Sequence, residues 1–336
     1  MIRGKRILFR VDAGEQIGLG HFFRSYHLAK ALRSKGFYVA FVHTESLFWG
    51  QLPSFEFEHY NLKSGKEEDQ TVEICIGGDF DLLYVDAICS FSEEKLKKVK
   101  PRTKVVFYQN LTESRFLSDI FILPSIHQND SFFEGFIKSG TKVYQGLEYS
   151  ILNERVNEAK QLGKNCGLKV NEVGIISGGS DPRNVLGAVY NLLDFDRWQE
   201  IIFVFYFGVN YLHHGSIPPS LPNNVSFKEF DFDKVIESDV VIAAFGVSTY
   251  ELLSIGMPVI SIGHQKSNTI ASDFLANRTG ALYHLGLIDD IDEGQLNQAI
   301  NTFLDADFRE KLGNRAKEIV DHKGVSRVIR IIEETL

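Results

Sequence analysis

The sequence predicts an α/β protein made of two Rossmann-like, doubly wound domains that face each other across a cleft. Apolar, strand-like runs alternate with helix-like stretches along the chain. Each half of the chain opens with a strand, a glycine-rich turn and the start of a helix. The length of 336 residues also exceeds what one hydrophobic core usually serves. These observations together favour two parallel sheets, each covered by helices.

The first half opens on residues 10–24, which read R-V-D-A-G-E-Q-I-G-L-G-H-F-F-R. Residues 6–11 (R-I-L-F-R-V) are typical of a buried first strand, and apolar residues then recur at helical spacing until Gly36. We expect Gly18 and Gly20 to give the turn its positive φ angles and to let a ligand approach the backbone closely.

His21 is the candidate general base. It falls in the first turn of the predicted helix, where free N–H groups and the helix dipole favour a neutral imidazole that can take a proton from water. Arg24 lies on the same helix face, and Asp12 ends the preceding strand, where open α/β sheets bind ligands. A purely structural interpretation, with His21 capping the helix and Asp12 closing the turn, is disfavoured because several polar groups converge there.

The rest of the first half continues the alternation of strands and helices. Asp86 ends a buried strand as Asp12 does, and its carboxylate is equally consistent with a functional and a structural role. Residues 44–53 look like an aromatic-rich loop, and residues 127–134 show no clear period. Residues 163–171 are polar and turn-rich, which makes them the best linker.

The domain boundary is therefore expected at residue 163. Residues 1–163 would form an N-terminal domain with the base and the sugar-facing side, and residues 164–336 a C-terminal nucleotide-binding domain. The last helix can pack back on the N-terminal domain. Such an arrangement would make residues 163–171 a hinge.

The second half repeats the strand, glycine turn and helix start, and its turns predict a phosphate site. Glu251, one turn into a helix, is placed to accept hydrogen bonds from a ribose diol, although a solvated helix carboxylate is the default interpretation. The residues expected to contact the substrate in this half are Gly178, Gly179, Ser180, Gly246, Val247, Ser248, Thr249, Glu251, His264 and Gln265.

Composition excludes several classes of protein. The net charge of −8 argues against a nucleic-acid-binding surface, and no stretch approaches transmembrane length. Cys75, Cys89 and Cys166 are too few and too scattered for a disulfide framework or a zinc site, and no metal-ligand cluster is apparent. We expect a cytoplasmic protein without a metal or a cofactor. The sequence leaves the oligomeric state open, with a monomer slightly favoured.

Three stretches resemble the UDP-2,4-diacetamido-2,4,6-trideoxy-β-L-altropyranose hydrolases of pseudaminic acid biosynthesis. They are R-x-D-x-x-x-x-I-G-x-G-H-x-x-R at residues 10–24, G-G-S-D-P-R-N at 178–184, and the region 246–265. The resemblance covers roughly residues 6–283 and implies the two-domain glycosyltransferase-B (GT-B) architecture. The chain departs from the family in residues 110–144, which match poorly, and in His264, where the family often has Asn.

The resemblance implies a metal-independent, inverting hydrolase that cleaves the anomeric C–O bond of a UDP-linked diacetamido-trideoxy sugar. It places the catalytic base at His21 and a nucleotide contact at Glu251, and it agrees with Asp12 orienting the water or the sugar. Gly18, Gly20 and Arg24 would then contact the substrate. An inverting GT-B glycosyltransferase and a non-catalytic nucleotide-sugar binding protein remain as alternatives. A dehydrogenase is disfavoured because the third glycine of the dinucleotide fingerprint is missing.

Overall fold

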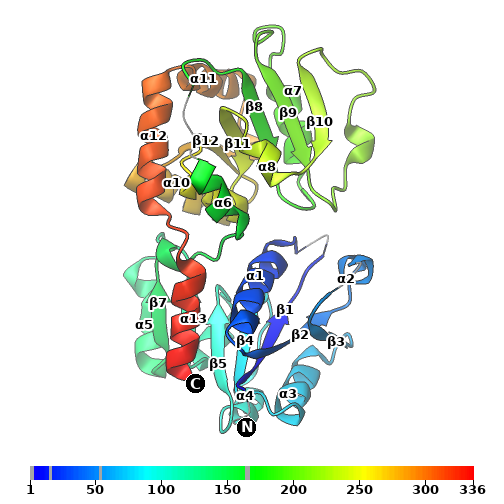
Figure 1. Cartoon of the computed structure of the whole chain (residues 1–336), viewed down its shortest axis with the longest axis vertical. Helices are drawn as coiled ribbons and strands as arrows, with labels where there is room; N and C mark the ends of the chain where they lie inside the picture. Colours follow the sequence, from blue (N-terminus) through cyan, green and yellow to red (C-terminus); the bar gives the residue numbers. More distant parts are fainter. Residues whose placement is uncertain (1–3, 15–16, 53–54, 163–166) are drawn as a thin grey trace. The chain divides into compact units, whose positions relative to one another are not determined.

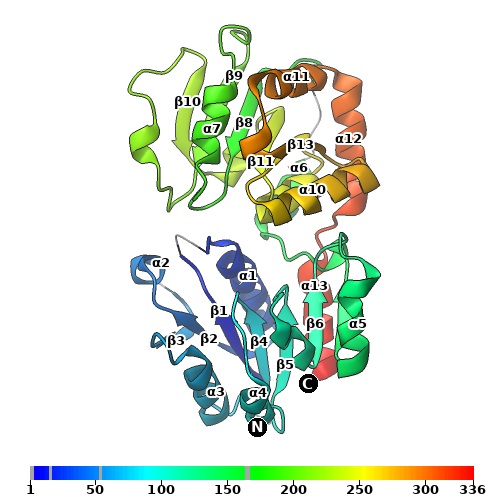
Figure 2. The same ribbon diagram turned by 180° about the vertical axis from the view of Figure 1, so that it is seen from behind.

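The chain forms two compact α/β units. A computed structural model describes residues 4–14, 17–52, 55–162 and 167–336. Unit 1 comprises Met1–Ile151 and Lys323–Leu336, and unit 2 comprises Leu152–His322. Each unit is built on one parallel sheet with helices packed on its faces, as Figures 1 and 2 show from opposite sides. The predicted α/β class with two parallel sheets is confirmed.

The division between the units differs from the predicted one at residue 163. Ile151 is 2% exposed in the core of unit 1, and its backbone N–H donates to the Tyr108 hydroxyl at 3.3 Å. The chain is therefore packed against the first sheet up to Ile151. The composition of residues 163–171 indicates an irregular segment, but packing decides which unit a segment joins. Residues 163–166 of that segment lie outside the described residues.

The elements of unit 1 follow the predicted alternation. Its described strands are β1 (Arg6–Val11), β2 (Tyr38–Thr44), β3 (Glu58–Leu62), β4 (Leu82–Asp86), β5 (Lys104–Tyr108), β6 (Ile120–Leu123) and β7 (Lys142–Gln145). Its described helices are α1 (Gly20–Ser34), α2 (Leu47–Gln51), α3 (Glu67–Gly77), α4 (Glu93–Val99), α5 (Asp130–Ser139) and α13 (Gly324–Thr335), with 3-10 turns η1 (Glu113–Leu117) and η2 (Leu147–Tyr149). The strands pair in parallel in the order β3-β2-β1-β4-β5-β6-β7.

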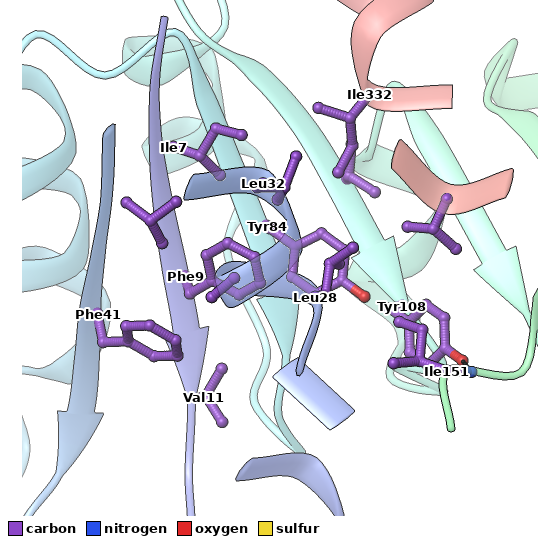
Figure 3. Packing of buried hydrophobic residues seen from close by; sticks show 14 of the residues in the cluster. Ile7, Phe9, Val11, Leu28, Leu32, Phe41, Tyr84, Tyr108, Ile151 and Ile332 are labelled. Carbon is purple, nitrogen blue, oxygen red and sulfur yellow. Dashed lines mark hydrogen bonds between the residues drawn. The ribbon is translucent and has the colours of Figure 1, made fainter. Parts of the chain in front are cut away.

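β1 lies in the middle of the core of unit 1 and is covered on both faces, which explains the apolar run at residues 7–9. On one face, Phe9 belongs to a cluster that also contains Leu28 and Leu32 of α1 and Ile332 of α13 (Figure 3). Leu8 points to the other face, in a cluster shared with α3, α4 and α5. α13 therefore completes the first core although it ends the chain. It begins at Gly324, where a Cβ would overlap the Ser150 backbone.

Unit 2 repeats this plan. Its described strands are β8 (Glu172–Ile176), β9 (Ile202–Phe207), β10 (Val225–Glu229), β11 (Val240–Ala244), β12 (Val259–Gly263) and β13 (Tyr283–Leu287). Its described helices are α6 (Arg155–Leu162), α7 (Val185–Leu192), α8 (Phe232–Val235), α9 (Val247–Ser254), α10 (Lys266–Thr279), α11 (Glu293–Phe303) and α12 (Ala306–Ile319), with 3-10 turns η3 (His214–Ser216) and η4 (Ile288–Asp290). The strands pair in parallel in the order β10-β9-β8-β11-β12-β13.

In both sheets the strand order reverses once, and the predicted base and glycine turns lie next to these reversals. In unit 1 the chain leaves β1 toward β2 and returns on the other side at β4, and in unit 2 it leaves β8 toward β9 and returns at β11. Open α/β sheets of this kind bind ligands at the carboxyl ends of the strands on either side of such a reversal. The predicted base follows β1, and the two predicted glycine turns of unit 2 follow β8 and β11.

Two helices lie where the sequence did not predict them. The aromatic segment after β2 contains α2, and α5 covers residues that showed no period. Asn129 explains the second case, because its side chain accepts a hydrogen bond from the Phe132 N–H and caps α5. Residues 127–134 contain only the first half of α5, which is too short a stretch to show a helical period. Within the described residues, no helix is long and apolar enough to cross a membrane.

Candidate active site

The turn between β1 and α1 sets the position of His21. Gly18 has φ +81° and pairs with Gly14, whose carbonyl accepts its N–H at 2.8 Å. A side chain at Gly18 would be strained, as expected for a residue in the left-handed region. Gly20 differs from the prediction, because it is the first residue of α1 and not a left-handed turn residue. His21 lies in the first turn of α1, as predicted.

His21 is paired with Asp86, the last residue of β4. The His21 Nδ1 lies 2.7 Å from Asp86 Oδ1, and the Asp86 side chain is fully buried while 18% of the His21 side chain is exposed. Burial alone would raise the pKa of Asp86, but the charge and hydrogen bonds of Arg24, together with His21, hold it below its usual value. An ionised carboxylate can only accept, so a neutral ring that donates its Nδ1–H to Asp86 would keep the lone pair on Nε2. A ring in that tautomer can take a proton at Nε2.

Arg24 is turned toward Asp86 and not toward solvent. Its Nε and Nη2 donate to the two oxygens of Asp86 at 2.6 and 2.5 Å, and its Nη1 donates to Gln109 Oε1 at 2.6 Å. The side chain is 7% exposed. Ser25 adds a hydrogen bond from its Oγ to Asp86 at 3.0 Å. The guanidinium of Arg24 is thus bound internally, and the substrate contact predicted for it stays a prediction.

Asp12 is held at the ends of β1 and β2. Its Oδ1 accepts from Arg10 Nη1 at 2.5 Å and from the backbone N–H and hydroxyl of Thr44 at 2.9 and 2.8 Å. Burial opposes ionisation of Asp12, but Arg10 and Thr44 keep its pKa below the usual value. Its carboxylate is therefore already engaged, and the carboxylate on His21 is that of Asp86. The role predicted for Asp12 in orienting water or sugar stays a prediction.

In unit 2, the first glycine turn is closely packed. Gly178 has φ +91°, and Gly208 after β9 approaches so closely that a Cβ there would overlap the carbonyls of Gly178 and Gly179. Ser180 is only 2% exposed. The Asp181 carboxylate accepts from the N–H groups of Val185 and Leu186 at 2.8 and 3.0 Å. The start of α7, predicted to suit a phosphate, is thus already capped by an anion of the chain itself.

The next two helices of unit 2 begin differently. Neither α9 nor α10 has an acidic residue in its first turn or a side-chain hydrogen bond from its N-cap residue. β11 and β12 are paired neighbours, so these two helix starts lie at adjacent strand ends. Gly246, Val247 and Ser248 are partly exposed, whereas Thr249 is buried and its hydroxyl accepts from the Gly246 N–H at 3.2 Å. Free helix starts of this kind favour an anion.

Two polar side chains near these helix starts have unused hydrogen-bonding atoms. Among the described residues, the buried Ser177 Oγ after β8 and the buried His264 Nδ1 after β12 have no partner. Burial lowers the pKa of His264, so its ring is neutral near pH 7. Gln265, beside it, is exposed and is the N-cap residue of α10. Unpaired buried polar atoms are costly and often mark a place where a ligand binds.

Glu251 lies in α9 and is buried, not solvated as the default interpretation would have it. It is 9% exposed, and its Oε1 accepts from the Asn153 N–H at 3.0 Å. Burial raises the pKa of Glu251 to about 6, in spite of that hydrogen bond. A carboxylate held in this way is destabilising when ionised, which favours a functional reason for its presence.

Sequence reasoning underrated one residue of the site and missed another. Asp86 was noticed only as a carboxylate at a strand end, with its role left open. Gln109 gave no signal, because neither its positive φ of 51° nor its contact with Arg24 can be read from the sequence. Among the described residues, no group of three or more His, Cys, Asp or Glu side chains could hold a metal ion.

Comparison with known proteins supports the resemblance inferred from the motifs. No protein-family model matches the chain. The spore coat polysaccharide biosynthesis protein SpsG of Bacillus subtilis is 24% identical over 343 residues, which cover 96% of each chain. The UDP-2,4-diacetamido-2,4,6-trideoxy-β-L-altropyranose hydrolase of Campylobacter jejuni is 26% identical over 181 residues, which cover 54% of this chain and 62% of that protein. The chain thus shows weak homology to the predicted hydrolase.

Solved structures establish the architecture. CalG4, the calicheamicin glycosyltransferase, aligns with a TM-score of 0.65 and 14% identity over 100% of this chain and 99% of its own. TcCGT1, solved in complex with UDP, aligns with a TM-score of 0.67 and 9% identity over 99% of this chain and 100% of its own. The fold is GT-B. At these identities the likeness of the GT-B chains concerns the fold alone.

Proposed function

We propose that this chain is a metal-independent, inverting nucleotide-sugar hydrolase. In this proposal it cleaves the anomeric C–O bond of a UDP-linked diacetamido-trideoxy sugar with water, and the free sugar enters nonulosonic (pseudaminic-type) acid biosynthesis. The observation that carries the proposal is the His21–Asp86 pair at the carboxyl ends of β1 and β4, with His21 Nδ1 2.7 Å from a buried carboxylate oxygen. A ring held in this way presents Nε2 as a general base.

In the proposed chemistry, unit 1 supplies the base and the carboxylate paired with it. Water donates a proton to His21 Nε2 as its oxygen forms a bond to the anomeric carbon on the face opposite the diphosphate. The C–O bond to the diphosphate breaks, and UDP leaves with the bonding electron pair. Asp86 stabilises the imidazolium formed in this step, because its carboxylate is already ionised and hydrogen-bonded to Nδ1. A diphosphate is a good leaving group, so little acid catalysis is required.

The nucleotide is assigned to unit 2. The starts of α9 and α10, which carry no acidic residue in the first turn, would bind the diphosphate, with Gly246, Val247 and Ser248 supplying backbone contacts. Ser177 and His264 offer unused polar atoms beside them. Glu251 would bind the ribose diol. The UDP in the TcCGT1 complex and the UDP-sugar in the name of the C. jejuni relative support uridine diphosphate as the nucleotide.

The sugar is assigned from the C. jejuni relative, whose name gives the diacetamido-trideoxy sugar. SpsG, a spore coat polysaccharide biosynthesis protein, matches almost the whole chain and supports a role in building a surface polysaccharide. The second candidate function is an inverting glycosyltransferase. CalG4 favours it, because the same base would take a proton from an acceptor hydroxyl in place of water. A non-catalytic binder is disfavoured because it needs no His21–Asp86 pair.

The decisive test is incubation of the chain with a panel of UDP- and CMP-sugars in ¹⁸O-labelled water, without any acceptor. We expect release of UDP, ¹⁸O on the anomeric carbon of the free sugar, and inverted configuration by NMR. His21→Asn should lose several orders of magnitude in turnover while UDP affinity stays unchanged. His59→Asn, at an exposed histidine of β3, is the matched control. UDP release only after an acceptor is added would establish the transferase instead, and full activity in His21→Asn would refute the mechanism.

A further inference from the structure

The side chain of Gln109 is connected to the His21–Asp86 pair through Arg24. Its Oε1 accepts from Arg24 Nη1 at 2.6 Å, and Arg24 in turn donates to both oxygens of Asp86. We propose that Gln109 and Arg24 are positioning residues, which hold Asp86 in place and keep His21 in the tautomer that has a free Nε2. This inference rests on the proposed function, in which His21 is the base.

The backbone fixes Gln109 at the end of β5. Its N–H donates to the Ile122 carbonyl of β6 at 2.8 Å. Its neighbour Asn110 is buried and donates from Nδ2 to the carbonyls of Ala87 and Cys89 at 2.8 and 2.7 Å, which ties this corner to the loop that follows Asp86. Gln109 itself has φ +51°, a left-handed conformation that a residue with a Cβ avoids. Such a conformation persists only where surrounding contacts impose it, and it is common at functional sites.

Arg24 transmits this fixed position to Asp86. The guanidinium is planar, so a hydrogen bond at Nη1 also sets the direction of Nε and Nη2. The Tyr108 ring supports the guanidinium from one side, with the Arg24 Cζ 5.1 Å from its centroid. Tyr108 is held in turn, because its hydroxyl donates to the Tyr149 carbonyl at 2.9 Å. The guanidinium therefore has partners at its edge and on one face.

The position of Arg24 matters because its Nη2 also lies 2.9 Å from His21 Nδ1. Two tautomers compete for this place. In one, Nδ1–H donates to Asp86 and Nε2 is free. In the other, Nδ1 accepts from Arg24, and the proton sits on Nε2, where it blocks the base. In the observed arrangement, Arg24 directs Nη1 to Gln109 and its Nε and Nη2 to Asp86. This orientation favours the tautomer in which Nδ1–H of His21 donates to Asp86. The charged groups that contact the His21 ring are Asp86 from β4 and Arg24 from α1.

Gln109→Gly separates positioning from folding. Glycine removes the acceptor and relieves the left-handed backbone, so the variant should be as stable as the wild type or more stable. We expect kcat to fall by about 10- to 100-fold, the range for residues that orient a catalytic side chain, with KM unchanged. Gln109→Glu keeps an oxygen for Arg24 and should recover most of the rate. Asp79→Gly, at another left-handed residue of unit 1 (φ +52°), is the matched control and should leave the rate unchanged.

A second readout does not depend on turnover. ¹⁵N NMR of the histidine rings, with the His21 signals assigned from His21→Asn, should show the Nδ1–H tautomer in the wild-type chain and a mixture in Gln109→Gly. Wild-type kcat in Gln109→Gly, or identical His21 spectra in the two proteins, would overturn the inference. If the wild type releases no UDP from any nucleotide sugar, the proposed function fails, and the NMR comparison alone still decides whether Gln109 sets the tautomer.

Discussion

Replacing Glu251 with glutamine should stabilise unit 2 and weaken UDP binding at the same time. Glu251 is 9% exposed, and burial raises its pKa from 4.5 to about 6. Since this pKa is higher in the folded chain than in the unfolded chain, the folded state binds the proton more tightly. The contribution of Glu251 to stability is therefore full below pH 4.5 and is lost as the pH rises through about 6.

The size of the effect follows from that difference. One pH unit corresponds to ~1.4 kcal/mol, so ionising Glu251 in the folded chain costs about 2 kcal/mol above pH 7. Glutamine carries no charge at any pH, and its side-chain oxygen can still accept from the Asn153 N–H. We therefore expect Glu251→Gln to raise the free energy of unfolding by about 2 kcal/mol at pH 8 and to leave it unchanged at pH 4.

The same change should weaken UDP. A carboxylate can accept from both ribose hydroxyls, whereas the amide offers a single acceptor oxygen. Loss of such a hydrogen bond typically costs about 1–3 kcal/mol, which is a rise of about 5- to 150-fold in Kd. The assays are denaturant unfolding of the full chain at pH 4, 6 and 8, and calorimetric titration with UDP at pH 8. Glu310→Gln, at an exposed glutamate of α12, is the control for both.

Two outcomes would refute this reasoning separately. If Glu251→Gln and the wild type show the same stability at pH 8, ionised Glu251 is not destabilising in the folded chain. If stability rises but the dissociation constant of UDP is unchanged, the ribose is bound elsewhere.

Two more predictions test the active site. Asp86→Asn should lower kcat on the order of 10³- to 10⁴-fold, because the amide no longer fixes the His21 tautomer, and should also destabilise the chain by leaving Arg24 without its anion. The control is Ser25→Ala, which removes only the 3.0 Å hydrogen bond to Asp86 Oδ2. A comparable loss of rate in both variants would show that His21 orientation is not the cause. Activity should persist in EDTA, because in the proposed site the helix starts take the place of a cation at the diphosphate. Loss of activity that magnesium or manganese restores would contradict this.

The sequence was sufficient for the parts of this protein that depend on neighbouring residues. The alternation of apolar strands with amphipathic helices predicted two parallel sheets. Gly18 marked a left-handed turn, and the residues that follow it placed His21 in the first turn of α1. These features are local, because turn geometry and helix starts are set within a few residues of each other. Even so, Gly20 differed from its prediction, since the end of the turn and the first residue of a helix look alike in sequence.

The tertiary structure decided which groups meet. Asp12 and Asp86 both lie at the ends of strands, and the sequence does not show which of them meets His21. The order of the strands brings Asp86 to the imidazole, although it lies 65 residues from His21 along the chain. Asp12 instead binds Arg10 and Thr44. Strand order depends on how helices cover both faces of a sheet, which is a property of the whole core. The boundary at Ile151 and the return of α13 to unit 1 have the same origin, since burial against a distant sheet outweighs local composition.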